Sequence, residues 1–177
     1  KINAEHFQAF MSPNYPALAE SGVHLKFFKQ HLLKPHINSV LKVRKKLEAN
    51  ILILKIFPGI SKNVVESILQ IKELKGVVLE TFGSGNAPSE KWFLNLFEVA
   101  INSGIQVVNV TQCAGGSVIM GDYETSIELE RIGIVSGFDI TTESALAKLM
   151  YLLGENIPRN EFKSIFETSL RGEITKE

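Results

Sequence analysis

The sequence lacks the features of extracellular, membrane-bound and nucleic-acid-binding proteins. Cysteine occurs once, at Cys113, so no intrachain disulfide can form, and a reducing compartment, the cytoplasm, is expected. No apolar run is long enough to cross a bilayer, and no signal-peptide pattern is present. The 19 basic and 19 acidic residues cancel, which argues against the basic surface that binds nucleic acid. We therefore expect neither a membrane nor a nucleic acid as a partner.

The histidines form no metal-binding pattern. All four precede the regular part of the sequence, and their spacing matches no metal-ligand motif. They are His6, His24, His31 and His36. We therefore assign no metal site.

What the sequence does contain is a regular alternation of apolar strands and amphipathic helices from Ile51 onward. Hydrophobic residues make up 45% of the chain, enough for a substantial core. Strands are predicted over residues 51–57, 77–81, 106–110 and 134–137. Helices are predicted after caps at Ser61 and at Thr141 or Thr142, around Trp92, over residues 123–131 and around Phe162. This alternation predicts an α/β fold, a three-layer open parallel sheet of about four strands with helices on both faces.

The residues before Ile51 follow a different pattern. Residues 1–33 show few strand signals and too little apolar surface to fold alone, so we interpret them as the tail of a preceding domain. Residues 34–50 are predicted to be a linker, and residues 51–177 the α/β domain. The basic cluster at residues 42–46 is interpreted as solvated linker rather than a phosphate-binding patch, because it is short and the net charge is balanced.

The stretch Gly76–Pro88 lies at the centre of the predicted site. An apolar strand runs into Gly83-Ser84-Gly85-Asn86, and Pro88 is expected in the first turn of the next helix. The following strand likewise enters a polar, glycine-rich loop at residues 111–116. Because ligands of open α/β sheets bind beyond the carboxyl ends of the strands, a small polar ligand is predicted at these loops.

Several side chains here are candidates for binding or chemistry, and each has a plainer interpretation. The Asn86 amide suits an amino-acid ligand, or it stabilises a turn. Thr111 is a candidate nucleophile and Cys113 a candidate thiolate, or the loop makes ordinary hydrogen bonds and the cysteine packs as a small hydrophobe. Glu80 binds a cation or an ammonium group, or it lies in water at the sheet edge.

Four motifs together resemble bacterial type I L-asparaginases, the cytoplasmic kind, in their order and spacing. They are Ile56–Ile60, Phe82–Pro88, Val108–Cys113 and Leu170–Glu173. The segment from Phe10 to Pro16 also resembles the end of the N-terminal domain of these enzymes. The resemblance implies the C-terminal domain, with a tail of the N-terminal domain, of an enzyme that hydrolyses L-asparagine to L-aspartate and ammonia without a cofactor.

The resemblance also implies partners that the chain itself does not supply. Family members are homodimers or homotetramers, and their N-terminal catalytic domain carries nucleophilic threonines in Gly-Gly-Thr and Asp-Gly-Thr-Asp motifs. Neither motif occurs in this sequence. A hydroxyl nucleophile needs a base and an oxyanion hole beside it. We therefore assign no catalytic residue to this chain and expect it to be inactive alone.

Two sets of binding residues follow from the resemblance. Asn86, with Gly85, matches the position that reaches a neighbouring subunit's active site and helps to hold substrate. Some members also bind asparagine as an allosteric effector, and the candidate residues for that site are Glu80, Thr81, Gly83, Thr111, Gln112 and Cys113. Those members have an arginine at the position of Glu80, and a carboxylate there would repel the ligand carboxylate. We expect activation by asparagine to be weak or absent.

Two other classes of protein fit the sequence. One is a stand-alone module that binds a small amino acid or an anion in its strand-end loops and catalyses nothing. The other is a flavodoxin-like scaffold that only mediates oligomerisation. The module predicts ligand binding by this chain alone, and the scaffold predicts no response near Asn86.

Overall fold

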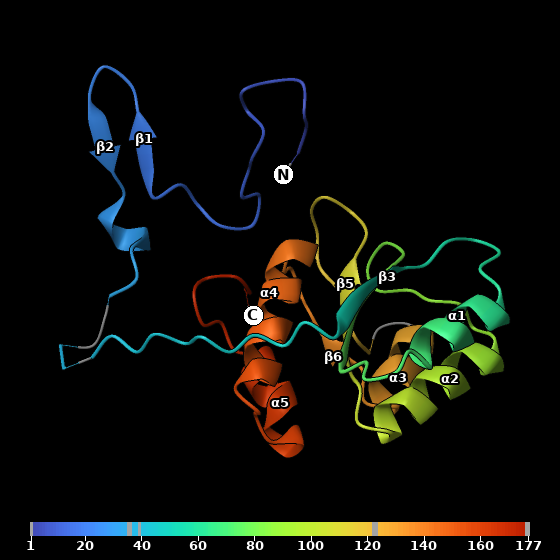
Figure 1. Cartoon of the computed structure of the whole chain (residues 1–177). Helices are drawn as coiled ribbons and strands as arrows, with labels where there is room; N and C mark the ends of the chain where they lie inside the picture. Colours follow the sequence, from blue (N-terminus) through green and yellow to red (C-terminus); the bar gives the residue numbers. More distant parts are fainter. Residues whose placement is uncertain (1, 35–36, 39, 122–123, 176–177) are drawn as a thin grey trace. The chain divides into compact units, whose positions relative to one another are not determined.

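The computed structural model describes residues 2–34, 37–38, 40–121 and 124–175. The chain divides into two compact units, Lys1–Arg44 and Lys45–Glu177, and each is described by itself (Figure 1). Residues 35, 36 and 39 of the predicted linker, and Tyr123 of the predicted helix, lie outside the described residues. The assignment of residues 1–33 to a preceding domain stays a prediction.

The first unit contains strands that the sequence did not indicate. Strands β1 (Ala19–Ser21) and β2 (Leu25–Phe27) pair antiparallel, and a 3₁₀ helix, η1 (Lys29–His31), follows. None of the described residues of this unit is buried. The sequence therefore failed to predict this hairpin. Its strands are held by backbone hydrogen bonds rather than by a packed apolar face, so they leave no hydrophobic pattern in the sequence.

The second unit is built on one parallel sheet. Its strands are β3 (Ile51–Lys55), β4 (Gly76–Thr81), β5 (Gln106–Thr111) and β6 (Val135–Ser136). They pair in the order β3-β4-β5-β6, all parallel, which confirms the predicted fold class. Strand β6 covers only the middle of the predicted 134–137, although the Gly137 N–H still donates to the Asn109 carbonyl of β5, 2.8 Å away.

The helices follow the strands as predicted. They are α1 (Lys62–Leu69), α2 (Lys91–Asn102), α3 (Glu124–Arg131), α4 (Thr142–Gly154) and α5 (Arg159–Phe166). The predicted caps are confirmed, because the hydroxyls of Ser61 and Thr141 accept from backbone N–H groups three residues later. The prediction for Pro88 was wrong, since α2 begins only at Lys91 after an extended N-cap at Glu90.

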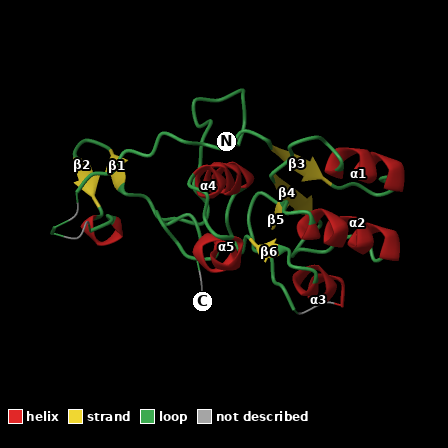
Figure 2. Ribbon diagram, turned by 60° about the horizontal axis from the view of Figure 1, so that its bottom comes forward, coloured by secondary structure: helices red, strands yellow, loops and turns green. Residues whose placement is uncertain are grey.

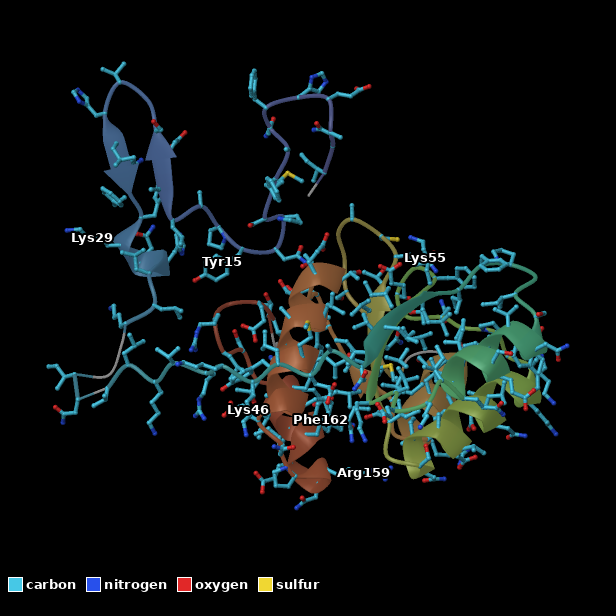
Figure 3. All side chains as sticks on the ribbon, viewed as in Figure 1. Tyr15, Lys29, Lys46, Lys55, Arg159 and Phe162 are labelled. Atoms are coloured by element: carbon cyan, nitrogen blue, oxygen red, sulfur yellow. The ribbon has the colours of Figure 1, made fainter. Side chains whose placement is uncertain are left out.

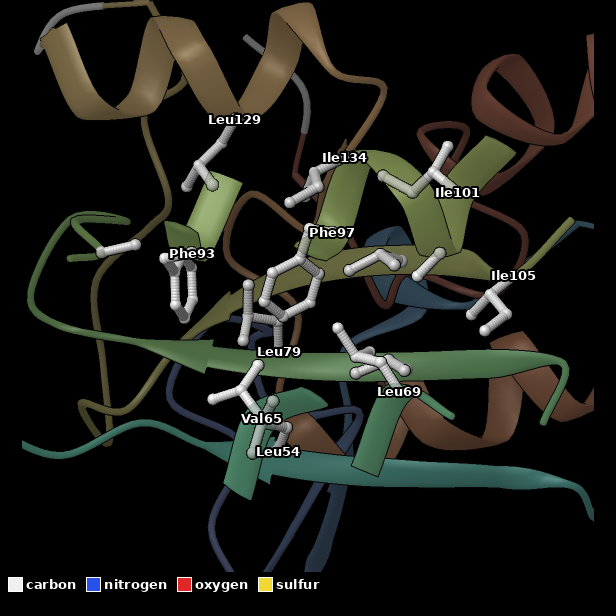
Figure 4. Close-up of a cluster of buried hydrophobic side chains, with 14 of the residues drawn as sticks. Leu54, Val65, Leu69, Leu79, Phe93, Phe97, Ile101, Ile105, Leu129 and Ile134 are labelled. Atoms are coloured by element: carbon white, nitrogen blue, oxygen red, sulfur yellow. The ribbon is translucent and has the colours of Figure 1, made fainter. Parts of the chain in front are cut away.

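Strand order explains why helices cover both faces of the sheet. The crossovers through α1, α2 and α3 all step in the same direction, so their common right-handedness places these three helices on one face. Helices α4 and α5 come after the last strand and cover the other face (Figure 2). Val77 and Leu79 of β4 pack towards the first layer, and Val78 packs towards the second. Figure 4 shows the first cluster, where Phe93 and Phe97 of α2 lie over Leu79.

The residues that lead into β3 are fastened to α4. The N–H of Glu48 donates to the carbonyl of Met150, 3.0 Å away, near the end of the helix. One turn further on, a Cβ at Gly154 would overlap the backbone carbonyl of Lys46. Glycine at this position allows the two backbones to touch.

The segment after α5 is anchored by an ion pair between a buried lysine and a partly buried glutamate. Lys148 Nζ of α4 lies 2.6 Å from Glu173 Oε1 and donates to the Thr168 carbonyl, also at 2.6 Å. Burial by itself would raise the pKa of Glu173, but Lys148 and the N–H groups of Leu170 and Arg171 lower it from 4.5 to about 2. Burial also lowers the pKa of Lys148, and the hydrogen bond and charge of Glu173 oppose that effect. The environment favours the ionised form of Glu173 but disfavours the charged form of Lys148. The net contribution of the ion pair to the free energy of unfolding is therefore smaller than the pKa shift of Glu173 suggests.

We predict that the stability contributed by Glu173 is lost as the pH falls from about 4.5 towards 2. The unfolded carboxyl has the higher pKa, so below about 4.5 it binds protons that the folded group does not. The loss amounts to about 3 kcal/mol at most. Glu173→Gln should lower the free energy of unfolding by about 2 to 3 kcal/mol at pH 7, and the difference from wild type should shrink near pH 3.

Urea unfolding of both proteins across this pH range measures the effect. Glu161→Gln, an exposed carboxylate on α5, is the matched control and should leave the pH dependence unchanged. If the Glu173→Gln and wild-type curves ran parallel down to low pH, the ionised pair would not contribute to stability.

Candidate functional site

The loop after β4 is a tight, hydrogen-bonded turn. Phe82 and Asn86 exchange backbone hydrogen bonds of 2.9 Å in both directions, forming an isolated antiparallel bridge. Gly85 lies inside this turn with φ +112°, and a Cβ there would come within 2.8 Å of Val118. Only glycine therefore fits both the turn and the approach of the next loop.

A buried polar pair lies beneath the turn. The Thr81 hydroxyl at the end of β4 donates to Asn109 Oδ1 of β5, 2.7 Å away, and both residues are 0% exposed. The Asn109 amide nitrogen reaches the Gly85 carbonyl at 3.4 Å and the Met120 sulfur at 3.7 Å. The pair thus joins two strands to two loops.

The predicted polar cluster at the end of β5 is engaged in the same framework. The Thr111 hydroxyl donates to the Gly83 carbonyl at 2.6 Å and accepts from the Cys113 N–H at 3.1 Å. Gln112 Nε2 donates to the carbonyls of Ile56 and Glu80, at 2.6 and 2.9 Å. The Gln112 side chain therefore ties together the ends of three strands, and its amide nitrogen already has two acceptors.

Glu80 has two partners of its own. Its Oε1 accepts from the Thr142 hydroxyl in the first turn of α4 at 2.6 Å, and its Oε2 lies 3.4 Å from Lys55 Nζ. Figure 3 shows Lys55 at the carboxyl end of β3. The Glu80 side chain is 13% exposed. The carboxylate thus binds a lysine of its own sheet, one of the two interpretations that the sequence left open.

Asn86 differs from the other predicted polar residues because its side-chain amide nitrogen can still donate a hydrogen bond to a ligand. Its Oδ1 accepts from the Thr125 hydroxyl of α3 at 3.2 Å. Its Nδ2 donates to no group among the described residues, and the side chain is half-buried. The bridge to Phe82 fixes the backbone, so an oriented amide donor is presented at the end of the sheet.

The structure therefore gathers the predicted site residues at one end of the sheet. Glu80, Thr81, Gly83, Gly85, Asn86, Thr111 and Gln112 lie within one hydrogen-bonded network, and Cys113 adjoins it through its N–H. The Cys113 thiol is exposed. The sequence predicted no role in this site for Asn109, Thr125 or Thr142, although Thr142 was a candidate helix cap. Asn109 carried a signal, since it interrupts a run of valines, whereas the two threonines lie far from the loops in sequence.

Neither threonine hydroxyl of the cluster is paired with a general base. The hydroxyls of Thr81 and Thr111 donate to an amide oxygen and to a backbone carbonyl, neither of which is a general base. Among the described residues, no group of three or more histidine, cysteine, aspartate or glutamate side chains is placed to hold a metal ion. Over the same residues, no helix is long and apolar enough to cross a membrane. The strand order does not reverse, so the described sheet has no topological switch point of the kind that binds ligands in doubly wound folds.

The fold of the chain matches that of a protein of known structure. The crystal structure of L-asparaginase I from Vibrio cholerae superposes with a TM-score of 0.89 at 38% identity, covering 98% of this chain and 52% of that one. The family model described as Glutaminase/Asparaginase C-terminal domain matches residues 50–166. The chain belongs to this family.

Two curated relatives match almost the whole chain. L-asparaginase 1 of Escherichia coli K12 is 39% identical over 175 residues, which are 99% of this chain and 51% of that protein. The 60 kDa lysophospholipase of Mus musculus is 42% identical over 176 residues, which are 99% of this chain and 31% of that protein. The chain thus spans about half of the bacterial relative and about a third of the mouse relative.

We predict that Thr81 and Asn109 stabilise the domain as a pair. Thr81→Val leaves the buried amide oxygen unpaired, and Asn109→Leu removes the links to both loops, so each should lower the free energy of unfolding by about 1 to 3 kcal/mol. The double variant should lose about 1 kcal/mol less than the sum of the two losses, because both substitutions break the same bond.

Chemical unfolding of the four proteins in this cycle measures the coupling. Ser103→Ala removes an exposed hydroxyl that bonds only within α2 and its cap, so its effect should add to that of Thr81→Val without coupling. Strict additivity of Thr81→Val and Asn109→Leu would contradict the assigned bond.

Proposed function

We propose that this chain is the C-terminal part of an L-asparaginase, an amidohydrolase that converts L-asparagine to L-aspartate and ammonia. The observation that carries the proposal is the match to L-asparaginases in sequence and structure over nearly the whole chain, together with the family match over residues 50–166. The name of the mouse relative denotes a different activity, that of a lysophospholipase, but this chain corresponds to a smaller share of that protein.

We assign Asn86 to substrate binding in a neighbouring subunit. Its backbone is fixed by the bridge to Phe82 and its Oδ1 by the Thr125 hydroxyl, and its Nδ2 donates to none of the residues that the structure describes. A carboxamide in this state suits a substrate carboxylate or amide oxygen. The role of Gly85 is to shape the turn. Its positive φ disfavours other residues, and the neighbouring Val118 leaves no room for a side chain.

The nucleophile comes from a preceding catalytic domain, as the family resemblance implies. The described hydroxyls of the strand-end cluster are used to hold the loops together, so this chain supplies binding and assembly rather than bond cleavage. The intact enzyme is a homodimer or homotetramer in the cytoplasm and uses no cofactor. A contribution of Asn86 to another subunit's site requires such an assembly.

The effector site of some family members is altered here. Effector-binding members have an arginine at the position of Glu80, and an arginine attracts a ligand carboxylate. Here the side chain is itself a carboxylate, bound to Lys55 and to the Thr142 hydroxyl, so it does not attract a ligand carboxylate. Gln112 and Thr111 also direct their donors at backbone carbonyls. We therefore propose that asparagine activates the intact enzyme weakly or not at all.

A chimera in which this chain replaces the matching half of Escherichia coli L-asparaginase 1 should hydrolyse L-asparagine. Ammonia release measures its activity. Asn86→Ala in the chimera should raise KM about tenfold with a smaller change in kcat, because a charge-assisted hydrogen bond to bound substrate is lost.

The matched control is Asn95→Ala, an exposed asparagine of α2, which should leave KM unchanged. Ammonia release by this chain alone would refute the assignment of the nucleophile to another domain. A folded, oligomeric chimera without asparaginase activity would refute the proposed function.

The rate of the chimera should follow a hyperbola in asparagine concentration, with a Hill coefficient near 1. The reason is the carboxylate of Glu80 at the candidate effector site. Unmodified Escherichia coli L-asparaginase 1 is assayed in parallel as the control. A difference in Hill coefficient between the two proteins is due to this chain, because the other half is the same in both. Strongly sigmoidal saturation of the chimera would show that an effector site persists despite Glu80.

The alternative is an amino-acid-binding or regulatory module without catalysis. It is favoured by one observation, the Nδ2 of Asn86, which lies on a hydrogen-bonded turn and has no partner among the described residues. Saturable binding of L-asparagine to this chain alone, with chemical-shift changes at Asn86, would support the module over the enzyme part.

A further inference from the structure

A groove of about 340 Å³ opens beside α4, and none of its lining residues belongs to the strand-end loops. One wall is a stripe of α4 with helical spacing, formed by Ser144, Ala147, Lys148 and Tyr151. Its volume lies at the lower end of the range typical of small-molecule sites. The groove is thus large enough for a compact organic ligand.

The other wall is the segment after α5, and it is preformed. Leu170, Arg171 and Glu173 line the groove. Glu173 accepts from the N–H of Leu170 at 3.0 Å, from the N–H of Arg171 at 2.6 Å and from Lys148 Nζ at 2.6 Å. These bonds fix the wall on α4 before any ligand arrives, which reduces the entropy cost of binding.

The polar groups of the groove differ in how far they are already paired. Lys148 is 4% exposed at its side chain, and its charge is balanced by Glu173. Among the described residues, the Arg171 guanidinium donates one bond, from Nη1 to the Leu170 carbonyl at 2.6 Å, and the residue is exposed. The hydroxyls of Ser144 and Tyr151 bond to no other described residue. The groove therefore offers one positive charge and two hydroxyl groups to a ligand.

We propose that this groove binds a small amphiphilic carboxylate, with the Arg171 guanidinium on the carboxylate and the Tyr151 ring, Ala147 and Leu170 around an apolar body. Arginine matches a carboxylate with two parallel N–H donors. The hydroxyls of Ser144 and Tyr151 hydrogen-bond the polar end of the ligand. The site is separate from the Asn86 turn, and the proposal does not depend on the proposed hydrolase activity.

Titration of the full 177-residue chain with phenylacetate tests the proposal, with phenylacetamide as the neutral isostere. The expected result is saturable change in the amide resonances of Ala147, Tyr151 and Leu170 at millimolar phenylacetate, with phenylacetamide binding about tenfold more weakly. Arg171→Met should weaken phenylacetate binding about tenfold. Ala147→Trp should fill the groove and abolish binding.

Arg131→Met is the matched control, because it removes an exposed arginine of α3 that does not line the groove. It should leave binding unchanged, and thermal unfolding should confirm that every variant is folded. Tyr151→Phe keeps the ring and provides a milder variant, with a loss of a few-fold.

Three results would overturn the proposal. They are the absence of saturable shifts, equal binding of phenylacetamide, and equal binding by Arg171→Met. If the same resonances moved on dilution of the protein without ligand, the groove would be a contact between copies of the chain, and the carboxylate site would likewise be refuted.

Discussion

The hydrogen bond between Thr81 and Asn109 is the constraint on which the strand-end architecture depends. It lies wholly buried between the two central strands, where an unpaired hydroxyl or amide would be costly. The same amide reaches the turn that carries Gly85. The position of the Asn86 side chain is therefore set by a polar contact in the core of the sheet rather than by the loop sequence alone.

This polar core is also connected to the second helical layer. Glu80 receives the Thr142 hydroxyl at the start of α4, while the end of α4 holds the chain that enters β3 through Met150 and Gly154. One helix thus contacts the strand ends at one terminus and the segment leading from the first unit at the other. Its middle carries Lys148, whose partner Glu173 fixes the last described segment of the chain.

The sequence was sufficient for the fold because the relevant signals are local. Apolar runs of strand length and amphipathic stripes such as that of Phe93 and Phe97 predicted the sheet and its layers, and Ser61 and Thr141 predicted two helix starts. The start of α2 was missed because Pro88 suits an extended approach as well as a first turn. The β1–β2 hairpin was missed because its strands have three residues each and no buried face.

The site was only partly predictable, for a physical reason. The loops and their residue types could be found from glycines and strand ends, but the partners of each side chain come from distant positions. Thr142 lies 62 residues from Glu80, and Thr125 lies 39 residues from Asn86. Hydrogen bonding over such separations is set by the packing of the layers, which no local pattern records.

The sequential strand order has a consequence for association between molecules. It leaves β3 and β6 as the two edges of the described sheet, where unpaired backbone groups invite further strands. Strand β6 has only two residues, and β3 ends in an exposed lysine after a basic approach segment. Both edges are thus poor templates for sheet extension, which disfavours association of further strands with this sheet.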